Sequence, residues 1–234
     1  MLVLPPHTLD DPVGRTKGSS LPEACPTDFR PVGGLAKRCA DVLLSSATLA
    51  LLLPTFLIIA ALIKLTSAGP IFFGHTRIGF GGRPFRCYKF RTMVRDSDTV
   101  LTELLSRSPA AAQEWALHRK LVDDPRVTAV GRFLRKSSLD ELPQLFNIFI
   151  GDMSCVGPRP VTQNELHRYG RTINDYVRAR PGLTGLWQVS GRNSVRYGRR
   201  VALDRVYVRH WSPLLDLAII LRTIPALLRT QQTS

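Results

Sequence analysis

The sequence contains little cysteine, and its cysteines follow no metal-binding or disulfide pattern. The four cysteines, Cys25, Cys39, Cys87 and Cys155, are far apart, and none belongs to a C-x-x-C pair. Neither a zinc site nor a disulfide framework is therefore indicated, and this usage is typical of a reducing cytosolic compartment. We expect Cys39, Cys87 and Cys155 to be small packing residues.

Acidic residues are also scarce. The chain has 18 Asp and Glu against 32 Lys and Arg, a formal net charge of +14, which predicts polyanionic partners or a membrane surface. Nucleic acid is the usual first candidate, but no zinc-finger, RNP-like or basic-zipper pattern is present, so we expect no nucleic-acid partner. An anionic inner-leaflet surface, together with nucleotide and lipid phosphates, accounts for the charge equally well.

A basic segment followed at once by an apolar run is lacking at the N-terminus, so we expect no cleaved signal peptide. Residues 1–33 are rich in proline, glycine and serine and show no apolar periodicity. They predict a disordered N-terminal tail. With 234 residues in all and 44% hydrophobic content, the remainder is long enough for one main domain with a real core.

One uncharged apolar run, residues 42–63, is long enough to cross a bilayer. Basic residues flank it on both sides, so the positive-inside rule assigns no orientation. Pro54 lies near its middle, where it removes a helical hydrogen bond and favours a kink. A kinked membrane helix over 34–66 that enters and leaves on the cytosolic face satisfies both observations. A plain spanning helix is the alternative.

The rest of the chain, 67–234, predicts a small cytosolic domain. Residues 71–93 predict a β-hairpin with a glycine-rich turn, and Lys89 shares one face of the second arm with Phe85 and Cys87. Without a following helix and a Lys-Ser/Thr pair, this turn is no P-loop. We expect helices over 99–122 with a break at Ser108-Pro109, over 164–178, and over 213–229. The last is expected at the membrane interface because Asp216 and Arg222 interrupt its apolar run. The fold class predicted is α+β, mostly helical and membrane-associated.

The chemistry-bearing stretch is 132–160. Its adjacent acids Asp140 and Glu141 lie between a basic cluster and the stiff turn around Arg159. Acids among so many bases suggest a site for a phosphorylated substrate with a metal ion. At 123–126, by contrast, the Asp-Asp-Pro-Arg sequence is expected to be a loop with a local ion pair.

A purely structural account of the acids is also available. Ser138 and Glu141 fit a capping box, but Pro143 would then be the fifth helical residue, where a backbone N–H is needed. Proline favours the first helical position, so we expect a helix from about Pro143 to Ile150, with both acids just ahead of it. In either register the acids lie at a helix N-terminus, which favours anions.

Five motifs resemble those of the bacterial sugar transferases, which are monotopic polyprenyl-phosphate hexose-1-phosphate transferases. They are Ser-Leu-Asp-Glu-Leu-Pro-Gln-Leu-Phe-Asn (138–147), Gly-Asp-Met-Ser-Cys-Val-Gly-Pro-Arg-Pro (151–160), Lys-Phe-Arg-Thr-Met (89–93), Asp-Pro-Arg-Val-Thr (124–128) and Arg-Pro-Gly-Leu-Thr-Gly-Leu-Trp-Gln-Val-Ser-Gly-Arg (180–192). The resemblance runs from about Gly33 to Pro225, and its motifs are long and ordered.

The resemblance implies transfer of hexose-1-phosphate, galactose or glucose, from a UDP-sugar to undecaprenyl phosphate, with release of UMP. Asp140 would form a covalent aspartyl phosphosugar, and Glu141 would bind Mg²⁺ (or Mn²⁺). The positions that contact phosphate in the family correspond to Lys89, Arg135 and Arg159. The family's site also contains a distal aspartate, which corresponds to either Asp204 or Asp216. Asp216 has the better-matching spacing from Trp211.

The resemblance also implies re-entrant insertion at Pro54 and a cytosol-facing domain on the bacterial inner membrane, where exopolysaccharide assembly begins. Known members usually carry serine before this proline, whereas Leu53 stands here. Membrane lipids are further expected partners, and a homo-oligomer is left open. The alternative is a non-enzymatic basic protein that docks on anionic lipid or nucleic acid. The Asp-Glu pair separates the two, because a docking protein has no need of acids within its basic surface.

Overall fold

The computed structural model describes residues 30–118, 120–191 and 195–229. Residues 1–29 of the predicted tail therefore lie outside the described residues, whereas its last residues, 30–33, are described. The Val32 N–H donates to the Arg178 carbonyl at 3.0 Å, and Val32 packs against a buried cluster around Tyr207.

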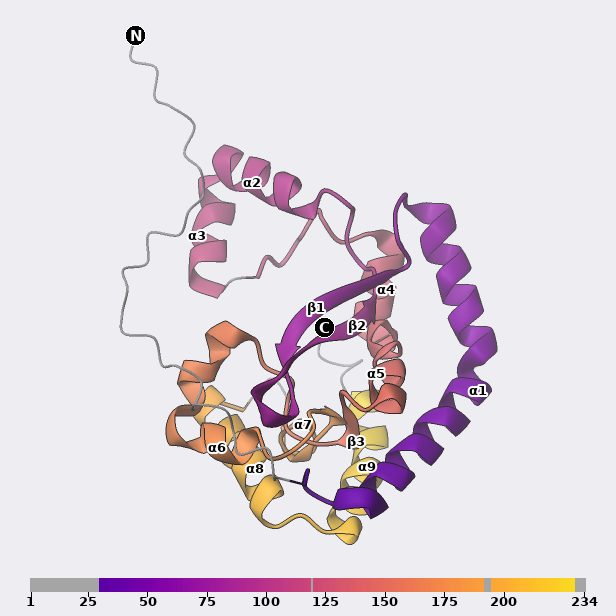
Figure 1. Ribbon diagram of the computed structural model, residues 1–234. Helices are drawn as coiled ribbons and strands as arrows, with labels where there is room; N and C mark the ends of the chain where they lie inside the picture. The colour runs from indigo at the N-terminus through magenta and orange to yellow at the C-terminus, as the bar shows by residue number, and fades with distance from the viewer. Residues whose placement is uncertain (1–29, 119, 192–194, 230–234) are drawn as a thin grey trace.

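The long apolar run forms α1 (Gly34–Thr66), which continues through Pro54 as one α-helix. Figure 1 shows α1 curving along one side of the molecule, beside α5 and α9. It is the one helix within the described ranges that is long and apolar enough to cross a membrane. The prediction of a possible membrane helix is therefore confirmed in length and composition, while the re-entrant kink stays a prediction. The side chains that α1 buries lie three or four residues apart within two groups, Asp41 with Ser45 and Phe56 with Ile59 and Ile63.

The predicted β-hairpin is confirmed. Strands β1 (Phe72–Ile78) and β2 (Pro84–Phe90) pair antiparallel, with Phe72 opposite Phe90. The 3-10 turn η1 (Phe80–Gly82) connects them, and its Gly81 has φ +66°, a conformation that glycine adopts without strain. Phe85 and Cys87 of β2 point into the core. Cys87 is thus a packing residue as expected.

The middle of the chain forms α2 (Ser97–Arg107), α3 (Pro109–His118), α4 (Ala129–Ser137), the 3-10 turn η2 (Leu139–Glu141) and α5 (Gln144–Ile150). The break that the sequence predicts at Ser108 is confirmed, and the Ser108 hydroxyl accepts from the Ala111 N–H at 3.2 Å. Thr128 caps α4 by accepting from the Gly131 N–H at 2.9 Å.

The C-terminal half contains β3 (Ser154–Val156), η3 (Gln163–Thr172), α6 (Ile173–Tyr176), β4 (Gly182–Thr184), α7 (Leu186–Val189), α8 (Tyr197–Arg209) and α9 (Pro213–Arg229). Strands β3 and β4 run parallel. The prediction of one polar helix over 164–178 is wrong, because that stretch is a 3-10 helix followed by a short α-helix. Gly170, with φ +48° and ψ −131°, interrupts the helical path.

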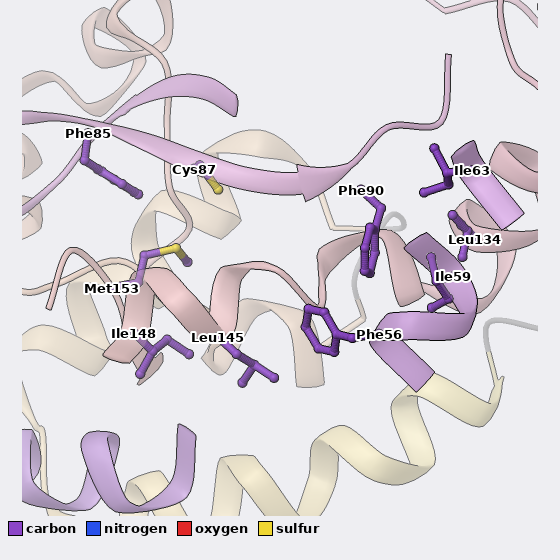
Figure 2. Packing of buried hydrophobic residues seen from close by; sticks show 10 residues of the cluster. All are labelled: Phe56, Ile59, Ile63, Phe85, Cys87, Phe90, Leu134, Leu145, Ile148 and Met153. Carbon is purple, nitrogen blue, oxygen red and sulfur yellow. The ribbon is translucent and has the colours of Figure 1, made fainter. Parts of the chain in front are cut away.

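Three buried clusters hold these elements together. The first joins α1, β2, α4 and α5, and Figure 2 shows Phe56, Phe90 and Leu145 meeting there. Because α1 supplies part of this core, α1 and the elements of this cluster form one packed unit. Cys155 is half-buried, but Cys39 is exposed on α1, so the expectation that Cys39 is a packing residue is wrong. The fold is mostly helical α+β, as predicted.

Candidate active site

The acids Asp140 and Glu141 lie in η2, between α4 and α5. Ser138 ends α4 in the left-handed region with φ +59°, and its side chain makes no capping hydrogen bond. The capping-box account is therefore wrong. Helix α5 begins at Gln144 after Pro143, so the acids lie just ahead of a helix, as the position of the proline predicts.

Lys89 of β2 reaches both acids. Its Nζ lies 2.6 Å from Glu141 Oε1 and 3.5 Å from Asp140 Oδ2. Asp140 is buried, with 8% of its surface exposed, whereas the Glu141 side chain is 41% exposed. The structure thus brings together three residues that the sequence singled out from segments about fifty positions apart.

For each of Asp140 and Lys89, burial and the opposite charges of the neighbouring residues shift the pKa in opposite directions. Burial raises the pKa of Asp140, and the Lys89 ammonium acts in the opposite direction, with the net pKa remaining raised. Burial also lowers the pKa of Lys89, but the carboxylates of Glu141 and Asp140 outweigh that effect and raise it overall. A persistent ammonium therefore faces a carboxyl that is held back from ionising.

Arg135 is oriented by a residue that sequence reasoning did not single out. The buried Thr92 accepts from Arg135 Nε through its hydroxyl at 2.9 Å. The Thr92 carbonyl accepts from the Thr128 N–H at 3.1 Å. Helix α4 approaches so closely that a Cβ on Gly131 would lie 2.0 Å from the Thr92 carbonyl oxygen. Thr92 lies within the Lys-Phe-Arg-Thr-Met motif, and that motif was the one feature of the sequence that could have pointed to it.

Asn147 is a second residue that the sequence reasoning missed. It is fully buried. Its Oδ1 accepts from the Tyr88 N–H at 2.9 Å, and its Nδ2 donates to the Arg86 carbonyl at 2.7 Å. This pair of bonds fixes β2 against α5 directly beside Lys89, which sets the position of the lysine relative to η2.

Arg159 lies in a different group of contacts. Its guanidinium lies 5.7 Å from the centre of the Trp187 ring, and that of Arg200 lies 4.9 Å from the same ring. Trp187 is buried, as expected for an ordinary core residue. The Arg159 turn is held by a close backbone crossing, because a Cβ on Gly157 would lie 2.4 Å from the Arg180 carbonyl oxygen. Within the described ranges Arg159 forms no ion pair with Asp140.

The two candidates for the distal acid have different surroundings. Asp204 is buried, and its Oδ2 accepts from the Tyr169 hydroxyl at 2.8 Å. Burial raises the pKa of Asp204 to about 7, although hydrogen bonds from Tyr169 and from the backbone of Arg159 act in the opposite direction.

Asp216 links the start of α1 to α8 and α9. It accepts from Lys37 Nζ at 2.5 Å, from the Tyr207 hydroxyl at 2.8 Å and from Trp211 Nε1 at 3.0 Å. Neither Asp204 nor Asp216 is in contact with Lys89 in the described part of the chain, and the choice between them stays a prediction.

The residues present fit a hard cation that keeps most of its own water. Among the described residues no three His, Cys, Asp or Glu side chains gather into one group, so a cage made wholly of protein ligands is not available. Mg²⁺ is usually held by one or two carboxylates together with substrate phosphates. Glu141 could supply one such carboxylate, and Lys89 Nζ, 2.6 Å from its Oε1, shows that a positive charge fits beside it. In the Asp-Asp-Pro-Arg loop, Arg126 pairs with Asp124 at 2.7 Å, which confirms the predicted local ion pair.

Comparison with known proteins gives long matches. A family model described as "Bacterial sugar transferase" matches residues 32–230. The chain is 56% identical over 198 residues to the exopolysaccharide production protein ExoY of Sinorhizobium fredii, covering 85% of this chain and 88% of that protein. It is 53% identical over 214 residues to ExoY of Rhizobium meliloti, covering 90% and 95%. It is 51% identical over 194 residues to the undecaprenyl-phosphate galactose phosphotransferase of Salmonella typhimurium, covering 82% of this chain and 40% of that protein.

Proposed function

Because this chain belongs to the bacterial sugar transferase family, we propose that it transfers hexose-1-phosphate from a UDP-sugar to undecaprenyl phosphate and so begins exopolysaccharide assembly. The family and the enzyme class predicted from the motifs are confirmed, and the docking-protein alternative loses its support. Galactose is the first sugar to test, because one relative is named for it, and glucose is the second.

The observation that carries the proposal is the position of Lys89 between the two acids. In the proposed first step, a carboxylate oxygen of Asp140 forms a bond to the β-phosphorus of the donor, and the bond from that phosphorus to the bridging oxygen breaks, releasing UMP. In the second step, a phosphate oxygen of the acceptor bonds to the same phosphorus, and the Asp140 carboxylate leaves. A carboxylate nucleophile thus divides one transfer into two easier displacements.

The surroundings of Asp140 suit an anionic reaction. Lys89 and Arg135 stand next to the reacting phosphate and oppose its charge as the bonds change. Arginine can hold a phosphate through two parallel hydrogen bonds. The Nε of Arg135 donates to Thr92, so the two terminal nitrogens of Arg135 are the ones proposed to bind the phosphate. Arg159 is proposed to hold the part of the donor that lies farther from Asp140.

Glu141 is the proposed metal-holding residue because it is the more exposed of the two acids. When bound there, Mg²⁺ would supply charge neutralisation for the donor diphosphate. Lys89 would then turn from Glu141 toward the substrate, while the buried Asp140 remains the group that reacts.

We also propose that α1 is re-entrant, with the domain on the cytosolic side of the inner membrane. Support comes from both ends of the helix. Near its start, Arg38 donates to the Ile148 and Phe149 carbonyls at 2.5 and 2.7 Å. Just beyond its end, Arg91 donates to the Ser67 carbonyl at 2.8 Å. A helix whose two ends contact one domain is difficult to place straight across a bilayer of about 30 Å.

The test is UMP release by detergent-solubilised protein with Mg²⁺, undecaprenyl phosphate and either UDP-galactose or UDP-glucose. Asp140→Asn should abolish both UMP release and the covalent phosphosugar detected by intact-protein mass spectrometry. Asp98→Asn, on exposed α2, is the matched control and should retain activity. Full activity in Asp140→Asn would refute the proposed nucleophile, and the faster donor would identify the sugar.

A further inference from the structure

Helix α5 buries one face and leaves the other exposed and apolar. At 100° per residue, its buried residues occupy one side, and Phe146, Phe149 and Ile150 occupy the opposite side. These three, called here the α5 strip, are 42%, 47% and 61% exposed. Exposed aromatic and aliphatic residues that adjoin on one helix face mark an interaction surface more often than chance.

The α5 strip begins next to the acids. Helix α5 starts three residues after Glu141, and with a rise of about 1.5 Å per residue the whole strip lies within roughly 10 Å along its axis. Phe146 also packs edge-on against Phe56 of α1, with ring centres 5.7 Å apart. The strip therefore lies beside α1 along its whole length, because Arg38 of α1 donates to the Ile148 and Phe149 carbonyls at the other end of α5.

The other helix that leads away from the acids has a different character. The outward residues of α4 include Arg132, Arg135 and Lys136 together with the exposed Phe133, so three cations surround its single outward aromatic ring. No residue of α5 carries a charge. A ligand with an anionic head and an apolar tail would match this arrangement, its head at Lys89 and Arg135 and its tail along α5.

We propose that the α5 strip binds the first isoprenoid units of the polyprenyl phosphate acceptor. This inference rests on the proposed function, because that reaction requires the acceptor phosphate to reach the phosphorus held on Asp140. The attached chain must then leave across a surface that starts at the acids. The strip is that surface, and Phe149 is its central residue.

The experiment separates the two half-reactions. Formation of the covalent phosphosugar from UDP-sugar needs no acceptor, so Phe149→Ala should form it at the wild-type rate. The second half-reaction is measured with undecaprenyl phosphate and with dimethylallyl phosphate, which carries a single isoprene unit. Phe149→Ala removes the contact proposed between the phenyl ring and the isoprenoid chain. It should therefore reduce the kcat/KM preference for the long acceptor about 5- to 10-fold, and Phe149→Leu should restore most of that preference.

Two further variants keep the test decisive. Ile150→Ala, at the far end of the strip, should shift the preference in the same direction by less. Leu221→Ala removes a residue of α9 that is similarly exposed at 59%, and it should leave the preference unchanged. Binding to anionic vesicles and the oligomeric state in detergent are measured for every variant.

An unchanged acceptor preference in Phe149→Ala and Ile150→Ala would overturn the proposal. An equal loss in Leu221→Ala that follows weaker vesicle binding would assign the strip to bilayer lipid instead. A loss that follows dissociation of oligomers would assign it to a second copy of the chain. Absence of acceptor-dependent UMP release by the wild-type protein would refute the proposed function itself, which none of the other outcomes does.

Discussion

Replacing Lys89 with methionine should slow formation of the covalent phosphosugar and move its pH dependence toward higher pH. At 3.5 Å from Asp140 and an effective dielectric constant of about 20, the attraction amounts to roughly 4–5 kcal/mol. Solvent reaches 33% of the Lys89 side chain, which reduces the net effect to about 1–3 kcal/mol. The expected loss of rate near neutral pH is therefore about 10- to 100-fold.

The direction of the pH effect follows from the reacting form. In the proposed mechanism the nucleophile is the Asp140 carboxylate, so the rate should rise with pH as the acid ionises. Burial already raises the pKa of Asp140, and Lys89 opposes that rise. Without the ammonium the pKa rises further, and the ascending limb of the pH–rate profile moves to higher pH.

The assay is single-turnover phosphosugar formation followed by mass spectrometry over a range of buffers. Lys136→Met, on the exposed surface of α4, makes the same change of net charge at a residue that forms no ion pair with Asp140 in the described part of the chain, and is the matched control. An ascending limb that stays in place in Lys89→Met, or one that moves equally in both variants, would refute the role given to Lys89.

Two other residues offer equally direct tests. Thr92→Val removes the hydroxyl that accepts from Arg135 and should lower kcat/KM for the UDP-sugar about 10- to 100-fold, as expected for a hydrogen bond to a charged group. Thr92→Ser should restore the activity, and equal loss in both variants would contradict the positioning role. Asp204 has a folded-state pKa of about 7 against an ordinary value of 3.8, so the folded state retains a proton that the unfolded chain loses, and stability should fall as pH rises between those values. Asp204→Asn cannot ionise and should flatten that fall in thermal unfolding, whereas parallel curves for the two proteins would contradict it.

The local elements were predictable because their signals are local. The alternating aromatics and clustered glycines predicted the hairpin, and Pro143 correctly placed the acids ahead of a helix. The one helix predicted wrongly, over 164–178, failed at Gly170, whose backbone conformation no apolar periodicity reveals. Cys39 was misplaced for a related reason: residue type indicates a tendency to be buried, but only the packing of α1 decides which of its faces is covered.

The candidate site was only half predictable. The motifs named Lys89, Asp140 and Glu141, which the structure brings into contact, and Arg135, whose charge acts on Asp140. The residues that hold them, Thr92 and Asn147, act through contacts between segments more than forty positions apart. A threonine and an asparagine carry no distinctive chemistry in a sequence, because their role depends on which donor or acceptor the fold places opposite them.

The same contacts argue that α1 has a part in shaping the site. Phe56, Ile59 and Ile63 of α1 share one buried cluster with Phe90 of β2 and Leu145 of α5, the strand that carries Lys89 and the helix that follows Glu141. Arg38 adds hydrogen bonds to the last carbonyls of α5. If α1 left this position, the cluster would lose its covering side, and the constraint that holds β2 against α5 would weaken with it. The position of α1 and the meeting of Lys89 with the acids are therefore coupled by packing, so a change in how α1 packs should also change the geometry of the candidate site.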